Sequence, residues 1–413
     1  MIALRTGRAY AREFGLFAAS TILVQAARFL FSLAAAWSLA PEDFTAWALT
    51  VALLVYAPSL LLGIANGMGR ELPILIGQER GEAADRSVGA TWTATAAAVV
   101  IVLGGALVVA AAWPRVLSSS LLVGILASGT IVFGTQQFIL RSTLRFDAAS
   151  LQQATFGVLA VTAAAFLAIN GDADFLTVAA LYGGALLLAI ILGLVLARPA
   201  RRPVDIDEMR RLAAIGLPIM LAGLVFSLFV TLDRWMAITL LGPERAAPYA
   251  LASLIAAAML VVPTVISQQT YPRMALAIGR GASIQELRGM ARHQGLVAAS
   301  MVAPVAIAIS LFAWLGIPRL MPSYAAAAPA AAALSAGFVV LGYFTGYGNY
   351  LNVVGGQRRY LAVQLVGVGF AIGLMFAGGR LLGLVGIAIG MSASHVIYGV
   401  MLREVARRTD LVG

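Results

Sequence analysis

Long apolar runs alternate with short polar breaks along almost the whole chain. About 20 apolar residues are needed to cross a bilayer as a helix. Twelve runs meet that length, at about 14–39, 44–68, 88–112, 117–140, 151–170, 175–197, 212–240, 246–270, 294–317, 324–352, 360–379 and 381–402. The pattern predicts an all-α polytopic membrane protein with twelve transmembrane helices.

The basic residues are unevenly shared between the breaks. All 28 of them are Arg. With twelve spans both termini lie on one side, and 22 of the 28 arginines fall on that side, against 4 on the other. Cytoplasmic loops carry such an excess, so we predict that both termini are cytoplasmic. The remaining two, Arg28 and Arg234, lie within spans.

Composition narrows the possible chemistry. Apolar residues make up 61% of the chain and charged residues only 11%, which is far from a soluble domain. With no Cys and two His, disulfides, thiolate chemistry and a His-ligated zinc site are not expected. We therefore predict no metal and no cofactor. Isolated charges between apolar spans do not fit a nucleic-acid binder, and the short far-side loops leave no lobe for an enzyme active site.

The chain carries an internal repeat. Its longest basic break, residues 198–211, separates an N-lobe at 1–197 from a C-lobe at 212–413. SLAPEDFTAWAL at 38–49 aligns with LLGPERAAPYAL at 240–251, which pairs Trp47 with Tyr249. Six spans in each half make the repeats parallel, as in transporters built from two lobes around a central cavity.

Polar residues follow one face of the first and the seventh span. Thr21, Gln25, Arg28 and Ser32 are spaced i, i+4, i+7 and i+11, and Ser227, Thr231 and Arg234 form a similar stripe. A charge inside the bilayer is costly unless it faces water or a partner, and guanidinium groups bind phosphate well. We predict a hydrated cavity that receives anions. The predicted substrate-binding residues are Arg28, Arg234, Gln25, Asp233, Ser227 and Thr231.

Asp233 allows several interpretations. It is adjacent to Arg234 but about 100° round a helix from it, so the two side chains are not expected to face each other. Asp233 could restrain Arg28 or another arginine, or titrate as a proton or sodium site. A purely structural alternative is that all three charges form interhelical ion pairs. The coupling ion, H⁺ or Na⁺, stays open.

A second polar group lies at the predicted cytoplasmic ends of the even-numbered spans. It predicts a basic vestibule for an anionic headgroup, made by Asn66, Arg70, Gln137, Arg141, Gln268 and Arg273. Arginines that extend from the interface to the headgroups are the simpler alternative. His395, in the last span, is predicted to be a hydrogen-bonded packing residue.

Several motifs resemble those of one transporter family. TLDRWMAITLLGPERAAPYALAS at 231–253 is similar to the family's seventh-helix Asp-Arg with a Gly-Pro-Glu turn and a Tyr-Ala pair. LAPEDFTAWAL, GMGRELPILIG and VVGGQRRYLAV are similar to its other motifs, in the same order along the chain. The family is that of the polysaccharide-export flippases, relatives of O-antigen flippases within the multidrug and oligosaccharidyl-lipid exporter superfamily. One departure is Thr45 and Ala46, where a Gly usually precedes the aromatic residue.

The resemblance implies a function. Such proteins flip undecaprenyl-pyrophosphate-linked oligosaccharides from the inner to the outer leaflet for surface polysaccharide synthesis. It implies a bacterial inner-membrane monomer that contacts this lipid-linked substrate, membrane lipids and other assembly proteins. The alternatives are a cation-coupled multidrug antiporter of the same superfamily, and a non-transporting scaffold of a polysaccharide assembly complex.

Overall fold

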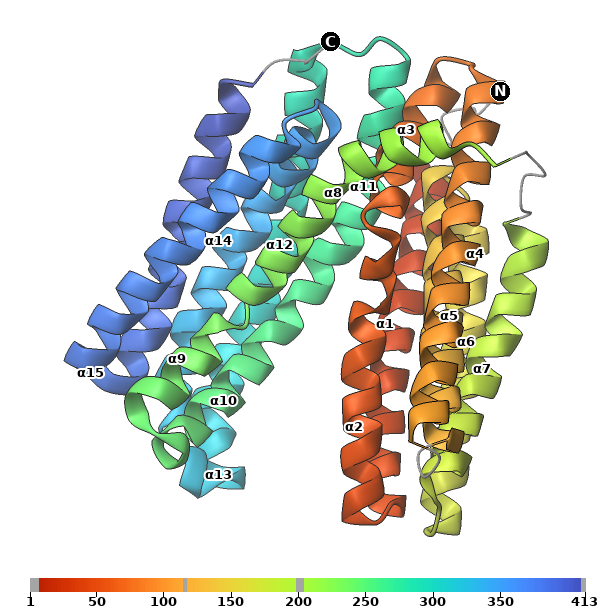
Figure 1. Cartoon of the computed structure of the whole chain (residues 1–413). Coiled ribbons are helices and arrows are strands. Elements are labelled where there is room, and N and C mark those ends of the chain that lie inside the picture. Colours follow the sequence, from red (N-terminus) through yellow and green to blue (C-terminus); the bar gives the residue numbers. More distant parts are fainter. Residues whose placement is uncertain (1–6, 114–116, 198–203, 410–413) are drawn as a thin grey trace. The chain divides into compact units, whose positions relative to one another are not determined.

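The computed structural model describes residues 7–113, 117–197 and 204–409, and within these ranges all regular structure is helical. By internal contacts the chain forms two compact units, Met1–Leu217 and Pro218–Gly413. The predicted linker at 198–211 lies partly outside the described residues, and the lobe boundary there stays a prediction. Figure 1 shows the course of the helices.

Among its described residues, unit 1 contains seven complete α-helices and one 3₁₀ segment. They are α1 (Gly7–Ser38), α2 (Pro41–Tyr56), η1 (Ala57–Leu61), α3 (Ile64–Gly77), α4 (Gly81–Ala112), α5 (Leu117–Ser142), α6 (Phe146–Asn170) and α7 (Phe175–Leu196). Helix α1 packs on α6, and α5 packs on α4 and α7. The first part of α8 (Ile206–Phe229) also belongs to this unit.

Unit 2 repeats this order of elements. It holds the rest of α8, then α9 (Leu232–Leu241), α10 (Pro243–Ala257), η3 (Ala258–Leu260), α11 (Val261–Gly279), α12 (Ile284–Leu315), α13 (Ile317–Leu320), η4 (Pro322–Tyr324), α14 (Ala327–Val353) and α15 (Gln357–Arg407). Helix α14 packs against both α12 and α15.

The bounds of these elements support the internal repeat. Helices α2 and α10 begin at Pro41 and Pro243, the two prolines that the repeat pairs, and each runs into a 3₁₀ segment before the next helix. Helices α4 and α12 are both 32 residues long. Proline at the first helical position has its fixed φ and loses no hydrogen bond there, which explains both starts.

Helix α15 is two spans joined at a tight turn. Its 51 residues would extend about 77 Å as one helix, far beyond a hydrocarbon core of about 30 Å. Gly383 has a φ of 58° and ψ of −134°, which ends the first arm. A Cβ built on Gly386 would lie 1.8 Å from the Gly378 carbonyl oxygen, so the arms pack back to back through glycines. Of eleven helical stretches long and apolar enough to cross a membrane in the described residues, this one counts twice, which agrees with twelve spans.

Single residues define several helix ends. Asp174 caps α7 by accepting a hydrogen bond from the Thr177 main-chain nitrogen at 2.8 Å. This bond holds the pKa of Asp174 below its usual value. Ser283 and Glu286 form a capping box at the start of α12.

A close main-chain contact in unit 1 joins the start of α3 to the middle of α8. A Cβ on Gly216 would lie 1.9 Å from the Gly63 carbonyl oxygen and 2.3 Å from the Gly67 nitrogen. Only glycine fits here, because the neighbouring atoms are main chain and cannot move aside.

We predict that Gly216→Ala destabilises the protein, by about 1 to 3 kcal/mol if the cost is that of ordinary overpacking. The measurement is the apparent Tm of the detergent-purified protein. Gly223→Ala, on the same helix, is the matched control, since a Cβ there meets nothing within 4 Å. Equal Tm values for the two variants would show that the contact does not hold α8 in place.

Candidate functional site

Arg28 lies on the exposed side of α1 in unit 1. Its guanidinium carbon is 5.8 Å from the centre of the Phe156 ring on α6. It also interacts with the Tyr182 hydroxyl on α7. Gln25, one turn earlier, is exposed as well. Among the described residues no carboxylate forms an ion pair with Arg28, so its charge is available to a ligand.

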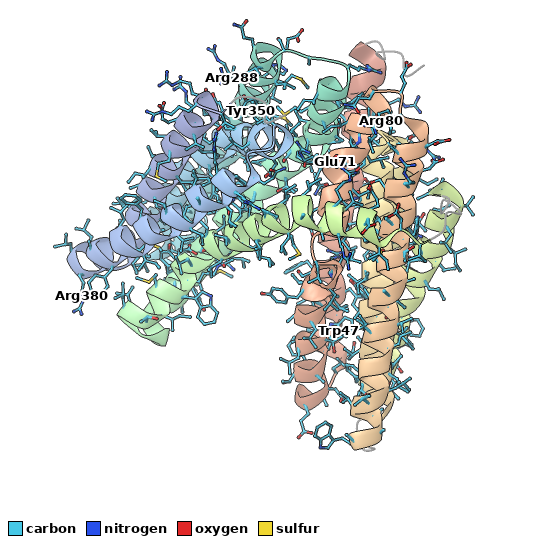
Figure 2. All side chains as sticks on the ribbon, turned by 45° about the horizontal axis from the view of Figure 1, so that its top comes forward. Trp47, Glu71, Arg80, Arg288, Tyr350 and Arg380 are labelled. Carbon is cyan, nitrogen blue, oxygen red and sulfur yellow. The ribbon has the colours of Figure 1, made fainter. Side chains whose placement is uncertain are left out.

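An aromatic cluster positions Arg28. Phe31, Trp47 and Tyr182 contact one another with ring centres 5.3 to 5.5 Å apart, and Tyr182 also contacts Phe156 at 5.5 Å. Trp47, marked in Figure 2, is only 1% exposed. Each such pair contributes about 0.5–1.5 kcal/mol beyond its burial. The cluster therefore gives Arg28 a rigid apolar support.

The predicted stripe on α1 divides between two environments. Thr21 is buried and donates hydrogen bonds to the Phe17 carbonyl at 2.8 Å and to Gln153 Oε1 at 3.1 Å. Thr21 therefore faces α6, whereas Gln25 and Arg28 are exposed.

Thr21 joins a network of buried amides. Gln153 donates to Gln137 at 3.0 Å, and Gln137 donates to Gln152 at 2.8 Å. Gln152 in turn donates to the Ala189 carbonyl on α7 at 3.1 Å. Glycine at position 193 leaves room for this amide, because a Cβ built there would lie 2.2 Å from the Gln152 amide nitrogen. The network links α1, α5, α6 and α7 inside unit 1.

This network corrects the prediction made for one vestibule residue, Gln137. Gln137 is 4% exposed, and its amide is used within the helix bundle. The sequence-based prediction assigned it to the vestibule because it lies with Arg141 among polar residues at the cytoplasmic end of an even-numbered span. Buried amides need partners inside the protein, and Gln137 finds them on α6.

The other vestibule residues of unit 1 differ in their partners. Arg70 forms an ion pair with Glu71, and Arg211 binds the same carboxylate at 2.9 Å. Glu71, labelled in Figure 2, was not predicted and offsets part of this positive charge. Arg141 donates to the Gln137 carbonyl at 3.0 Å and lies 4.9 Å from the Phe138 ring centre. Asn66 is half-buried.

In unit 2, Asp233 accepts hydrogen bonds from three groups. They come from the Tyr249 hydroxyl at 3.0 Å, the Ser253 hydroxyl at 2.8 Å and the Arg234 main-chain nitrogen at 2.9 Å. Asp233 is 2% exposed. A carboxylate with this many donors is stabilised inside its own unit.

Arg234 is joined to Asp233 through Ser253. The Arg234 Nε donates to the Ser253 oxygen at 3.0 Å, and that hydroxyl donates to Asp233. The two side chains do not form a direct ion pair in the described structure, as the sequence predicts, but a hydroxyl couples them. Arg234 remains half-buried. The sequence missed Ser253 and Tyr249, although the repeat pairs Tyr249 with the equally buried Trp47.

The seventh span, predicted at 212–240, is found as one apolar stretch over Ile206–Leu241, but its helix is broken within it. Helix α8 ends at Phe229 and α9 begins at Leu232, with Thr231 at φ −119° and ψ −8° between them. Thr231 donates to the carbonyls of Ser227 and Leu228, at 2.8 and 3.2 Å. Such back-bonding bends helices. Ser227 and Arg234 therefore lie on different helices and do not form a continuous helical stripe.

The predicted vestibule residues of unit 2 lie on α11. Arg273 interacts with the Gln269 side chain at 3.3 Å, and Gln268 is half-buried beside it. Ser267 donates to Asn349 on α14 at 3.0 Å. A substrate role for these residues stays a prediction.

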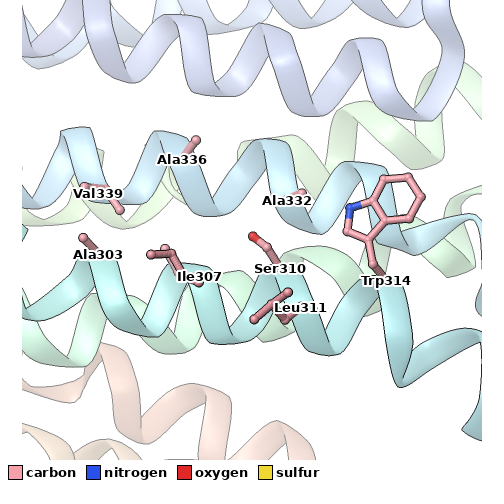
Figure 3. A pocket seen from close by; sticks show the side chains of 9 residues that line it. Ala303, Ile307, Ser310, Leu311, Trp314, Ala332, Ala336 and Val339 are labelled. Atoms are coloured by element: carbon pink, nitrogen blue, oxygen red, sulfur yellow. The ribbon is translucent and has the colours of Figure 1, made fainter.

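An apolar groove of about 480 Å³ runs between α12 and α14 in unit 2. Figure 3 shows the side chains that line it, among them Ile307, Leu311 and Trp314, with Ser310 as its polar member. None of the predicted site residues lines this groove. Its lining carries no charge, so it does not suit an anionic group.

Solved structures share this fold over almost the full chain. A point mutant of VcmN, a MATE transporter from Vibrio cholerae, matches with a TM-score of 0.80 and 14% identity, over 97% of both chains. A multidrug resistance MATE family transporter of the MOP superfamily, in an outward-facing conformation, matches with a TM-score of 0.74 and 17% identity, over 96% of this chain and 94% of that one.

A third match is a MOP superfamily transporter from Pyrococcus furiosus, whose binding pocket is described as having reverse polarity. Its TM-score is 0.73 at 15% identity, over 96% of this chain and 95% of that one. No family model and no curated protein sequence matches the chain. At these identities the comparisons establish the fold, which is that of MATE transporters.

We predict that Asp233→Ala lowers stability by about 1–3 kcal/mol, since two buried hydroxyls lose their acceptor. Tyr249→Phe removes one of these bonds and should cost about 1 kcal/mol. The measurement is thermal unfolding of the purified protein. Ser227→Ala is the control, because its exposed hydroxyl bonds only to the Gly223 carbonyl among the described residues. If all three variants unfold together, the Asp233 cluster does not stabilise unit 2.

Proposed function

We propose that this protein is a membrane transporter that works by alternating access and has no catalytic activity. The fold supports this, because the MATE transporter structures match it along nearly their whole length. The repeat and the helix break at residues 230–231 add support, since transporter sites are often built from discontinuous helices.

Two substrate classes are supported by different observations. The comparisons favour a multidrug antiporter over a flippase, because MATE transporters, one of them a multidrug resistance protein, supply the structural matches. The charges favour an anionic substrate. The comparisons concern other proteins, whereas the charges belong to this chain's own residues. We therefore give more weight to the charges.

The observation that carries the anionic substrate is Arg28. It is a mid-span arginine, exposed, fixed against aromatic rings and without a described carboxylate partner. A cationic drug would need an available acid, and Asp233, the acid within a span, is buried and accepts three hydrogen bonds. The reverse-polarity pocket described for the Pyrococcus furiosus transporter gives a precedent for a change of substrate charge within this superfamily.

The substrate we propose is a lipid-linked oligosaccharide that carries pyrophosphate, flipped across the bacterial inner membrane for surface polysaccharide synthesis. Arg28, in unit 1, would bind the pyrophosphate, because a guanidinium can donate two hydrogen bonds to neighbouring phosphate oxygens. By the same chemistry we propose Arg234, in unit 2, as a second phosphate-binding arginine. Gln25, which is exposed one turn before Arg28, would add a neutral donor. The basic residues Arg141 and Arg273 would attract the headgroup before it enters.

We predict that Arg28→Ala and Arg234→Ala each reduce surface polysaccharide at least about tenfold, since a hydrogen bond to a charged group contributes about 1.5–3 kcal/mol. Protein levels should be unchanged, and the lipid-linked precursor should accumulate. Arg380→Ala is the matched control, because its guanidinium also lies over a ring, 5.5 Å from Phe376. Normal export in both variants would contradict the assignment.

The same strains separate the alternatives. If overexpression gives resistance to ethidium, and deletion of the gene leaves the glycan unchanged, the protein is a drug antiporter. If Arg28→Ala and Arg234→Ala leave the glycan intact while deletion removes it, the protein is a scaffold.

A further inference from the structure

His395 is a fully buried polar side chain without a hydrogen-bond partner. It lies on the second arm of α15 and is 0% exposed. The main chain of Gly337 interacts with the ring, but at a geometry that leaves Nδ1 and Nε2 without a hydrogen bond. The sequence-based expectation of a packing residue is therefore confirmed, and the hydrogen bond that it also expects is reduced to this interaction with Gly337.

Two phenyl rings enclose the imidazole. Phe229 on α8 and Phe338 on α14 have ring centres 5.3 and 5.2 Å from that of His395. An unpaired buried polar group is costly and rare in native proteins, so its presence calls for an explanation. A third apolar ring would fill this place without that cost.

The ionisable groups around His395 give it no counter-ion. Residues 218–229 of α8 and 327–342 of α14 carry none. Helix α9, which packs on α15, brings Asp233 and Arg234, whose side chains bind Ser253. On α15 itself, Tyr398 interacts with Tyr360 and Gln364. In this geometry the neutral ring is favoured, because a charge there would be shielded from bulk solvent and would have no acid beside it among the described residues.

The position of Phe229 connects His395 to the predicted substrate site. Phe229 is the last residue of α8, directly before the break that precedes Asp233 and Arg234. Its ring also contacts Tyr398 at 5.3 Å. A change in the charge of His395 would therefore act on the residue at the end of α8, and through it on the placement of Arg234.

We propose that His395 is a proton-binding site of unit 2. One of its two unpartnered nitrogens takes a proton from water in a conformation that opens this packing, and returns it to water when the rings close again. Imidazole suits this task because it exchanges a proton near neutral pH. The use of this proton as the coupling ion rests on the proposed transport function, whereas the site itself does not.

The test is a pH titration of ¹⁵N-histidine-labelled His293→Gln protein in nanodiscs, in which His395 is the sole imidazole. Between pH 8 and 5 we expect imidazolium signals to appear beside the neutral ones in slow exchange, since protonation requires a conformational change. The control is His395→Gln, whose imidazole signals come from His293 and therefore identify which signals belong to His395. A His395 ring that stays wholly neutral down to pH 5 would overturn the proposal.

A second variant guards against misfolding. His395→Phe keeps a ring between Phe229 and Phe338, so its Tm should not fall below that of the wild type. Intrinsic tryptophan fluorescence should change between pH 8 and 5 in the wild type and in His293→Gln, and should not change in His395→Phe. An unaltered pH response in His395→Phe would overturn the proposal. Absence of transport in a protein whose His395 titrates would instead refute the transport function alone.

Discussion

The structure depends on one constraint, that a polar group inside the hydrocarbon core must find its partner within the protein. The amides of Gln137, Gln152 and Gln153 satisfy it by bonding to one another and to main-chain carbonyls. Asp233 satisfies it with two hydroxyls and a main-chain nitrogen. These clusters fix which faces of the helices meet inside each unit. They also make the polar groups that lack such partners stand out.

Arg28 and His395, one in each unit, lie outside these clusters and pack against aromatic rings. Arg28 has an aromatic support and no described acid, so its charge can serve a ligand. His395 has aromatic neighbours on both sides and no hydrogen bond. A stable fold alone would favour apolar side chains at both positions. Their presence agrees with the proposed transporter, in which one unit binds an anion and the other responds to a proton.

Much of this architecture follows from the sequence. Apolar run length gives the twelve spans, and the alignment of Pro41 with Pro243 gives the repeat, because both depend on local patterns along the chain. The break at residues 230–231 does not follow, since no Gly or Pro stands between Leu224 and Leu241 to mark it. The partners of Asp233 and Arg28 also do not follow. Ser253 lies 20 residues from Asp233 and Tyr182 lies on α7, so only the packing of helices brings them together.

We propose that this protein, with its MATE fold, binds an anion at Arg28. Isothermal titration of the purified protein with farnesyl pyrophosphate and, separately, with ethidium tests it most directly. The account predicts that the pyrophosphate binds, that salt weakens this binding, and that Arg28→Ala weakens it about tenfold or more while Arg380→Ala does not. Binding of ethidium without binding of farnesyl pyrophosphate would contradict it.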